Sequence, residues 1–145
     1  MPRSLHTRFT VILLALGALL VLTGCGAGTS SVSLAPASML PDFASQAPPR
    51  VRDAYRYAIA HADDLEQYPC YCGCNTMGHM SNLGCYIQEI DAGGEITFDN
   101  HAIGCGICID ITQDVMRMRA EGRSAQEIRA YVDNTYSAYG PSTDT

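Results

Sequence analysis

The chain has 145 residues, of which 47% are hydrophobic and 17% charged, and this length suits one ordinary domain with short extensions. Nine arginines, with no lysine, against fifteen acidic residues give a net charge of −6, so the chain lacks the basic surface expected of a nucleic-acid-binding protein. These values exclude a multidomain enzyme and argue against nucleic acid as a partner. Seven cysteines are the unusual feature of the composition.

The N-terminal segment has the pattern of an export signal. Arg3 and Arg8 precede an apolar run at 11–22, which is shorter than the ~20 residues that a membrane-spanning helix needs. The sequence Leu-Thr-Gly-Cys that ends at Cys25 follows directly and resembles a bacterial lipobox, although Cys25 could also be a free thiol beside an ordinary cleavage site. We expect a lipoprotein signal peptide at 1–24, a lipidated Cys25 and an exported chain anchored to the cell membrane.

The rest of the chain divides into a tether, a domain and a tail. Residues 25–47 are rich in Gly, Ala, Ser and Pro and are expected to form a flexible tether. The folded domain is placed at 48–140, followed by a short tail at 141–145. The cysteine-rich middle of the domain lacks regular apolar spacing, so we expect crosslinks or a metal ion to order it.

The first part of the domain is predicted to contain a helix and then a hairpin. Apolar residues recur at helical spacing over 51–65, with a proline pair in front and Pro69 behind. The segments 85–90 and 95–98 flank Asp-Ala-Gly-Gly, which favours a short β-hairpin, although 83–90 is also compatible with one or two helical turns.

Two further helices are predicted in the second part of the domain. Helical spacing over 107–118 ends at Gly122, which fits the left-handed residue after a helix. Ser124 and Glu127 form a capping box, and an apolar face follows until the Gly-Pro pair at 140–141. The predicted fold class is therefore mainly α, a small domain of about three amphipathic helices with a cysteine-rich loop region and a short β-hairpin.

Soft metal ligands gather within residues 70–108. Three thiols occupy alternate positions in Pro-Cys-Tyr-Cys-Gly-Cys at 69–74, and a Cys-x-x-Cys pair stands at the start of the second long helix. The candidate ligands are six cysteines and two histidines: Cys70, Cys72, Cys74, Cys85, Cys105, Cys108, His79 and His101. Met77 and Met80 are weaker candidates.

The spacing of the first three thiols limits how they can act. Residues two apart in a strand lie ~6.6 Å apart, whereas sulfurs that share a tetrahedral ion with bonds of ~2.3 Å lie ~3.8 Å apart. An extended segment therefore cannot chelate, but Gly73 can adopt a positive φ and let the segment curl. Disulfides within the triplet would close very tight rings, so any crosslinks would join it to Cys85, Cys105 or Cys108.

Three interpretations of the cysteines remain open. The first is a thiolate-rich metal site, for which Cu(I) is favoured and Zn²⁺ is the alternative, since both accept soft ligands. The second is a set of three structural disulfides, as is common in exported proteins. The third is thiol–disulfide redox chemistry at Cys105 and Cys108, because a helix start stabilises a thiolate. No carboxylate pair is arranged for acid–base catalysis, so we expect a binding protein rather than an enzyme.

The hexapeptide at 69–74 also carries a family resemblance. The chain resembles the bacterial PCYCGC-motif lipoprotein family, and further matching features are Gly78-His79, Cys85, His101, the Gly-Cys-Gly-Ile-Cys segment at 104–108 and residues 128–133. The resemblance implies an exported lipoprotein whose shared residues are mostly soft metal ligands. We expect it to sequester copper or to deliver it to a membrane-bound copper enzyme, while lipidated Cys25 holds the chain at the lipid bilayer.

Overall fold

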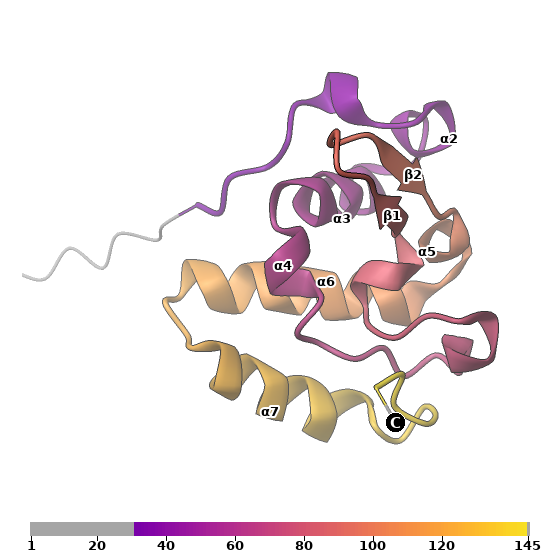
Figure 1. Ribbon diagram of the computed structural model, residues 1–145. Helices are drawn as coiled ribbons and strands as arrows, with labels where there is room; N and C mark the ends of the chain where they lie inside the picture. Colours follow the sequence, from indigo (N-terminus) through magenta and orange to yellow (C-terminus); the bar gives the residue numbers. More distant parts are fainter. Residues whose placement is uncertain (1–30, 145) are drawn as a thin grey trace, which may run out of the picture.

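The computed structural model describes residues 31–144, and this part of the chain folds as six α-helices and one two-stranded antiparallel sheet (Figure 1). The mainly α fold with a small hairpin is confirmed. The predicted signal peptide and the lipidation site Cys25 lie outside the described residues. Within 31–144, no helix has the length and apolar character needed to cross a membrane.

The helices differ greatly in length. Three of them span three or more turns: α3 (Pro49–Ala60), α6 (Gly106–Ala120) and α7 (Ala125–Tyr136). The other three are single turns: α2 (Asp42–Ser45), α4 (Ala62–Leu65) and α5 (His101–Gly104). Short 3₁₀ turns occur at Ala37–Met39, Cys74–Met77 and Leu83–Cys85.

Helix α6 lies between α3 and α7, and its apolar face supplies much of the core (Figure 1). Ile111 and Val115 of α6 are fully buried, as are Ile128 and Val132 on the facing side of α7. Burial of each such side chain stabilises the fold by about 1.5–3 kcal/mol. Because the start of α6 also carries Cys105 and Cys108, the same packing that builds the core fixes two of the six clustered cysteines.

The first predicted helix is interrupted. The segment 51–65 forms α3 and α4, which are separated at His61, where the backbone leaves the helical region with φ −138° and ψ 43°. The imidazole of His61 stacks on Tyr57 and lies 2.8 Å from the carbonyl oxygen of Ser33. Helical spacing alone does not reveal the break, because Leu65 of the short second helix is still fully buried.

The second and third helices agree with the predicted pattern at three of their four ends. Helix α6 is followed by Gly122 with φ 77°, and the capping box joins Ser124 to Glu127 in both directions. Helix α7, however, ends at Tyr136 rather than at the Gly-Pro pair. The chain then turns back over the cysteine segment, where a Cβ on Gly140 would lie 2.9 Å from the carbonyl oxygen of Tyr71.

The hairpin consists of β1 (Ile87–Ile90) and β2 (Ile96–Phe98), joined by the predicted turn. Asp91 Oδ1 accepts hydrogen bonds of 2.8 Å from the backbone amides of both Gly93 and Glu95. The helical turn that was the predicted alternative for 83–90 also occurs, because a 3₁₀ turn at Leu83–Cys85 directly precedes β1. This turn places Cys85 in the core.

Part of the predicted tether belongs to the folded unit. Ala35 and Ala44 are buried, and Ala35 exchanges hydrogen bonds with Arg56 of α3, one from its amide at 3.2 Å and one to its carbonyl oxygen at 2.6 Å. Phe43 also contacts Tyr55 edge to face. Small residues of this kind suit a tether and a close-packed segment equally well. Contacts with α3 therefore begin N-terminal to residue 48, where the folded domain is predicted to start.

Candidate metal site

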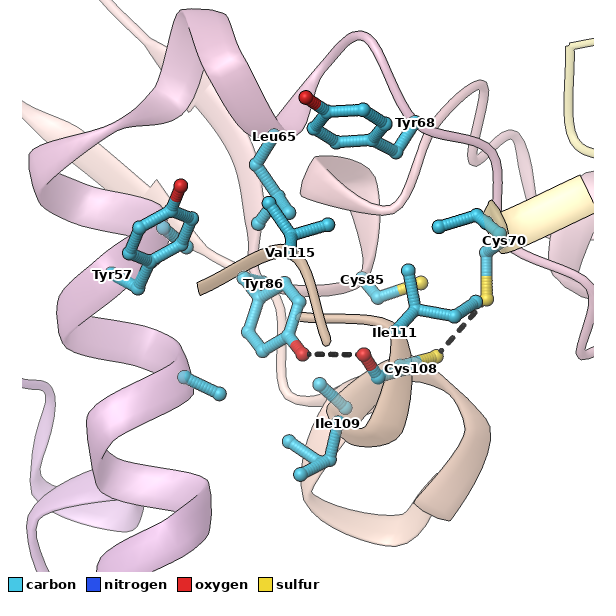
Figure 2. Packing of buried hydrophobic residues seen from close by; sticks show 14 of the residues in the cluster. Tyr57, Leu65, Tyr68, Cys70, Cys85, Tyr86, Cys108, Ile109, Ile111 and Val115 are labelled. Carbon is cyan, nitrogen blue, oxygen red and sulfur yellow. Dashed lines mark hydrogen bonds between the residues drawn. The ribbon is translucent and has the colours of Figure 1, made fainter. Parts of the chain in front are cut away.

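Four separate segments bring the cysteines together. The loop after α4 carries Cys70 and Cys72, and the 3₁₀ turns carry Cys74 and Cys85. The fourth contributor is the junction of α5 and α6, where Cys105 precedes α6 and Cys108 lies in its first turn. Figure 2 shows the side chains of Cys70, Cys85 and Cys108 converging within the core.

The Cys-x-Cys-x-Cys segment is curled, as the chelation argument requires. Gly73 adopts a φ of 81°, a left-handed conformation that glycine tolerates without a Cβ penalty. This turn directs the chain so that the sulfurs of Cys72 and Cys74 lie within 4.8 Å of each other. The sulfur atoms of Cys70 and Cys72, just before it, lie 3.3 Å apart instead of at the spacing of a strand. The prediction that Gly73 turns this segment is confirmed.

Three sulfurs form a triangle with the dimensions of a metal–thiolate face. Sγ of Cys70 lies 3.3 Å from Sγ of Cys72 and 3.3 Å from Sγ of Cys108, and the third edge, from Cys72 to Cys108, is 3.7 Å. A tetrahedral ion with Zn–S bonds of ~2.3 Å separates its sulfur ligands by ~3.8 Å. Cys74 and Cys85 are 3.7 Å apart at their sulfurs, and Cys72 lies 3.7 Å from Nε2 of His101.

All eight predicted ligands belong to groups that could hold a metal ion. Within residues 31–144 there are three such groups, and in each the ligand atoms lie within 4.8 Å of one another. They are Cys70, Cys72, Cys74 and Cys85; Cys72, His101, Cys105 and Cys108; and Cys74, His79 and His101. The six cysteines of this part of the chain are all free thiols. The cluster is therefore capable of holding a metal ion.

His79 gives an independent indication that a ligand belongs here. Its Nε2 lies 3.4 Å from Oδ2 of Asp99, while its Nδ1 is buried and is the one buried side-chain nitrogen or oxygen in residues 31–144 without a hydrogen-bond partner. An unsatisfied buried polar atom costs about 1–3 kcal/mol. A carboxylate that fixes one imidazole nitrogen and leaves the other free is the usual arrangement around a metal-binding histidine. The residues present thus fit a bound metal.

Comparison with known proteins identifies the family but not an activity. A family model described as a protein of unknown function with PCYCGC motif matches residues 22–145. The chain belongs to the PCYCGC-motif family. No curated protein and no solved structure matches the chain. The hexapeptide that gives the family its name supplies Cys70, Cys72 and Cys74 of the cluster.

In this PCYCGC protein a buried polar network, which sequence reasoning missed, holds Cys108. The carbonyl oxygen of Cys108 accepts hydrogen bonds from Asn82 Nδ2 at 3.3 Å, from the Tyr86 hydroxyl at 2.9 Å and from the Thr112 hydroxyl at 3.1 Å. The single proton of the Thr112 hydroxyl is shared with a second acceptor, Asn82 Oδ1, at 2.7 Å. Figure 2 shows the contact from Tyr86. No sequence pattern marks Asn82, whose role is visible only from its complete burial between the cysteine loop and α6.

Thr143, in the predicted tail at 141–145, forms hydrogen bonds with Cys70 of the site. The backbone amide of Cys70 donates to Thr143 Oγ1 at 2.9 Å, and the amide of Thr143 donates to the carbonyl oxygen of Cys70 at 3.1 Å. Thr143 is 1% exposed, so this pair is shielded from water. The segment after α7 is therefore part of the folded domain up to residue 144.

The acid–base properties of the thiols differ from those predicted at the start of α6. A hydrogen bond with Cys108 lowers the pKa of Cys70 far below its ordinary value, and one with Cys85 lowers the pKa of Cys72 to about 5. Burial raises the pKa of Cys105, and the hydrogen bond with Cys70 raises the pKa of Cys108. The expected thiolate stabilisation at Cys105 and Cys108 is wrong, because burial and neighbouring thiols outweigh the helix start. The favoured thiolates are Cys70 and Cys72, whose pKa values are lowered.

Proposed function

We propose that this protein binds soft metal, Cu(I) in preference to Zn²⁺, through its six clustered cysteines with help from His79 and His101. The observation that carries the proposal is the triangle of Cys70, Cys72 and Cys108 sulfurs with edges of 3.3–3.7 Å, built from two distant parts of the chain. The free Nδ1 of His79 supports it. Soft thiolate ligands favour Cu(I) over hard cations, and Zn²⁺ accepts the same set.

The biological setting is proposed from the N-terminal sequence. A signal peptide at 1–24 would export the chain, and lipid on Cys25 would anchor it to the outer face of the cell membrane. There the protein would sequester copper or deliver it to a membrane-bound copper enzyme. Binding requires no catalytic step and no nucleic acid.

One observation favours a second candidate, a disulfide-stabilised scaffold. The sulfurs of Cys70 and Cys108 lie 3.3 Å apart, so oxidation would join them with little movement of the backbone. Redox catalysis at Cys105 and Cys108 is less favoured, because a raised pKa at both residues reduces the thiolate fraction on which reactivity depends.

The test is a Cu(I) competition with a chromogenic chelator. Reduced protein without its signal peptide, with Cys25→Ser so that only the cluster thiols remain, should withdraw Cu(I) from the chelator. The double variant Cys72→Ser with Cys105→Ser should lose this ability, whereas Thr76→Ser, an exposed change in the same loop, should retain it. Unchanged affinity in the double variant would refute the site, and six paired thiols with no metal would establish the scaffold instead.

A further inference from the structure

Two of the metal-ligand groups contain four residues each and share a single one. The first consists of Cys70, Cys72, Cys74 and Cys85, which we name the inner set. The second, the outer set, consists of Cys72, His101, Cys105 and Cys108. The ligand atoms within each set lie inside 4.8 Å of one another, and Cys72 belongs to both.

One tetrahedral ion cannot use all of these ligands. An ion in the inner set leaves Cys105, Cys108 and His101 arranged around the thiolate of Cys72, and an ion in the outer set leaves three further thiols around the same sulfur. A thiolate sulfur has more than one lone pair, so Cys72 can bind an ion on each side. Either first ion thus leaves a second set of converging soft ligands.

Resting on the metal binding proposed above, we propose that the cluster holds two ions that share the thiolate of Cys72. The inner ion is bound by the four cysteines of the inner set, and the outer ion by the three cysteines and His101 of the outer set. The third group, Cys74 with His79 and His101, draws on both sets, so His79 adds a ligand beside them rather than a separate site.

The two sets differ in their access to solvent. Cys70, Cys74 and Cys85 of the inner set are at most 2% exposed. In the outer set Cys108 is also fully buried, but Cys72, His101 and Cys105 line a surface hollow of about 570 Å³. Gly104 and Gly106 border the same hollow, and a Cβ on either would meet no atom within 4 Å, so the approach is open. The outer ion is therefore the one that exchanges with solution.

The number of bound ions tests this arrangement directly. Native mass spectrometry of the mature chain with Cys25→Ser, loaded with Zn²⁺ under reducing conditions, should show two ions per chain. Cys105→Ser should lose one ion, and Thr76→Ser should keep both. One ion in the parent chain would overturn the shared site while leaving the proposed metal binding intact, whereas no bound ion after loading with Zn²⁺ and, separately, with Cu(I) would overturn both.

Release of Zn²⁺ to an excess of a chromogenic chelator tests the two environments. We expect two kinetic phases of equal amplitude, a fast one from the outer ion and a slow one from the inner ion. The variant Cys105→Ser should lose the fast phase. Because Cys105 is only half-buried, this variant is compatible with folding, and circular dichroism checks it; His101→Ala, which removes a different outer ligand, should lose the same phase. A single phase in the parent chain, or loss of the slower phase in both variants, would contradict the inner and outer assignment.

Discussion

The sulfur atoms of Cys70 and Cys108 lie 3.3 Å apart although 38 residues separate them in the sequence. This contact joins the family hexapeptide to the first turn of α6, and it is buried on both sides. Hydrogen bonds fix both residues: Asn82 donates to the carbonyl oxygen of Cys108, and Thr143 accepts from the backbone amide of Cys70. The geometry of the cluster therefore depends on residues that carry no metal-binding chemistry of their own.

Asn82→Ala should destabilise the domain and loosen the cluster. The change removes the 2.7 Å acceptor of the buried Thr112 hydroxyl and one donor to the Cys108 carbonyl, so we expect a loss of about 1–3 kcal/mol in the free energy of unfolding. Urea unfolding followed by circular dichroism measures it. Asn134→Ala, on the exposed face of α7, is the matched control and should change stability by less than about 0.5 kcal/mol. Equal losses of stability in the two variants would show that the Asn82 hydrogen bonds do not stabilise the domain.

Thr143→Val should show that the C-terminal segment is part of the fold. Valine keeps the shape of threonine but leaves the buried amide of Cys70 without its acceptor, and we expect a cost of about 1–3 kcal/mol. The same substitution at Thr135, which is exposed on α7, provides the comparison. If thermal or urea denaturation fails to distinguish the two variants, the Cys70–Thr143 pair does not contribute to stability.

Asp99→Asn should weaken metal binding without removing a ligand. Asp99 lies beside Nε2 of His79 and accepts a 2.7 Å hydrogen bond from the backbone amide of His101, so its carboxylate contacts the His79 imidazole and fixes the backbone that carries His101. Loss of such a partner typically reduces metal affinity about 10–100-fold. Chelator competition with Zn²⁺ or Cu(I) measures the change, and Glu89→Gln on the exposed face of the hairpin is the control. An affinity equal to that of the control would show that Asp99 does not position the histidines.

The stability of the domain should fall in acid partly because of Asp64. Burial acts to raise the pKa of Asp64, but hydrogen bonds from Arg119 and Tyr57 outweigh it and lower that pKa below its usual value. The unfolded chain therefore binds the proton more readily, and the stabilisation, fully present above the ordinary aspartate pKa of about 4, is lost as pH falls through the lowered folded-state value.

Asp64→Asn tests this dependence. The variant should be less stable by about 2 kcal/mol at neutral pH, and the difference from the parent protein should shrink as the pH falls. Urea midpoints across an acid series measure both effects. Asp63→Asn, an exposed neighbour in the same turn, should follow the parent curve. A constant difference between Asp64→Asn and the parent at every pH would contradict the assignment.

The long helices could be predicted because their causes are local. Apolar spacing and the capping box of Ser124 and Glu127 act within a few residues, and α6 and α7 follow them. The break at His61 depends instead on Ser33, which lies far away in the sequence. The packing of Ala35 on α3 and of Thr143 on Cys70 is likewise invisible to composition, because small residues suit both tethers and close contacts.

The identity of the candidate ligands could also be predicted, but not their arrangement. Residue type and the turn at Gly73 indicated a site that chelates a soft metal. The meeting of Cys70 with Cys108, and the orientation of His79 by Asp99, arise from tertiary packing that one sequence does not display. The acidity of Cys105 was predicted in the wrong direction for the same reason, since its burial depends on distant segments.

The most direct test of the central claim is metal analysis, with a thiol count, of the protein purified anaerobically from the cells that produce it. A metal–thiolate cluster predicts bound copper or zinc and six thiols that an alkylating reagent modifies only after a chelator removes the metal. Protein that carries no metal and whose six cluster cysteines are paired in disulfides would contradict the account.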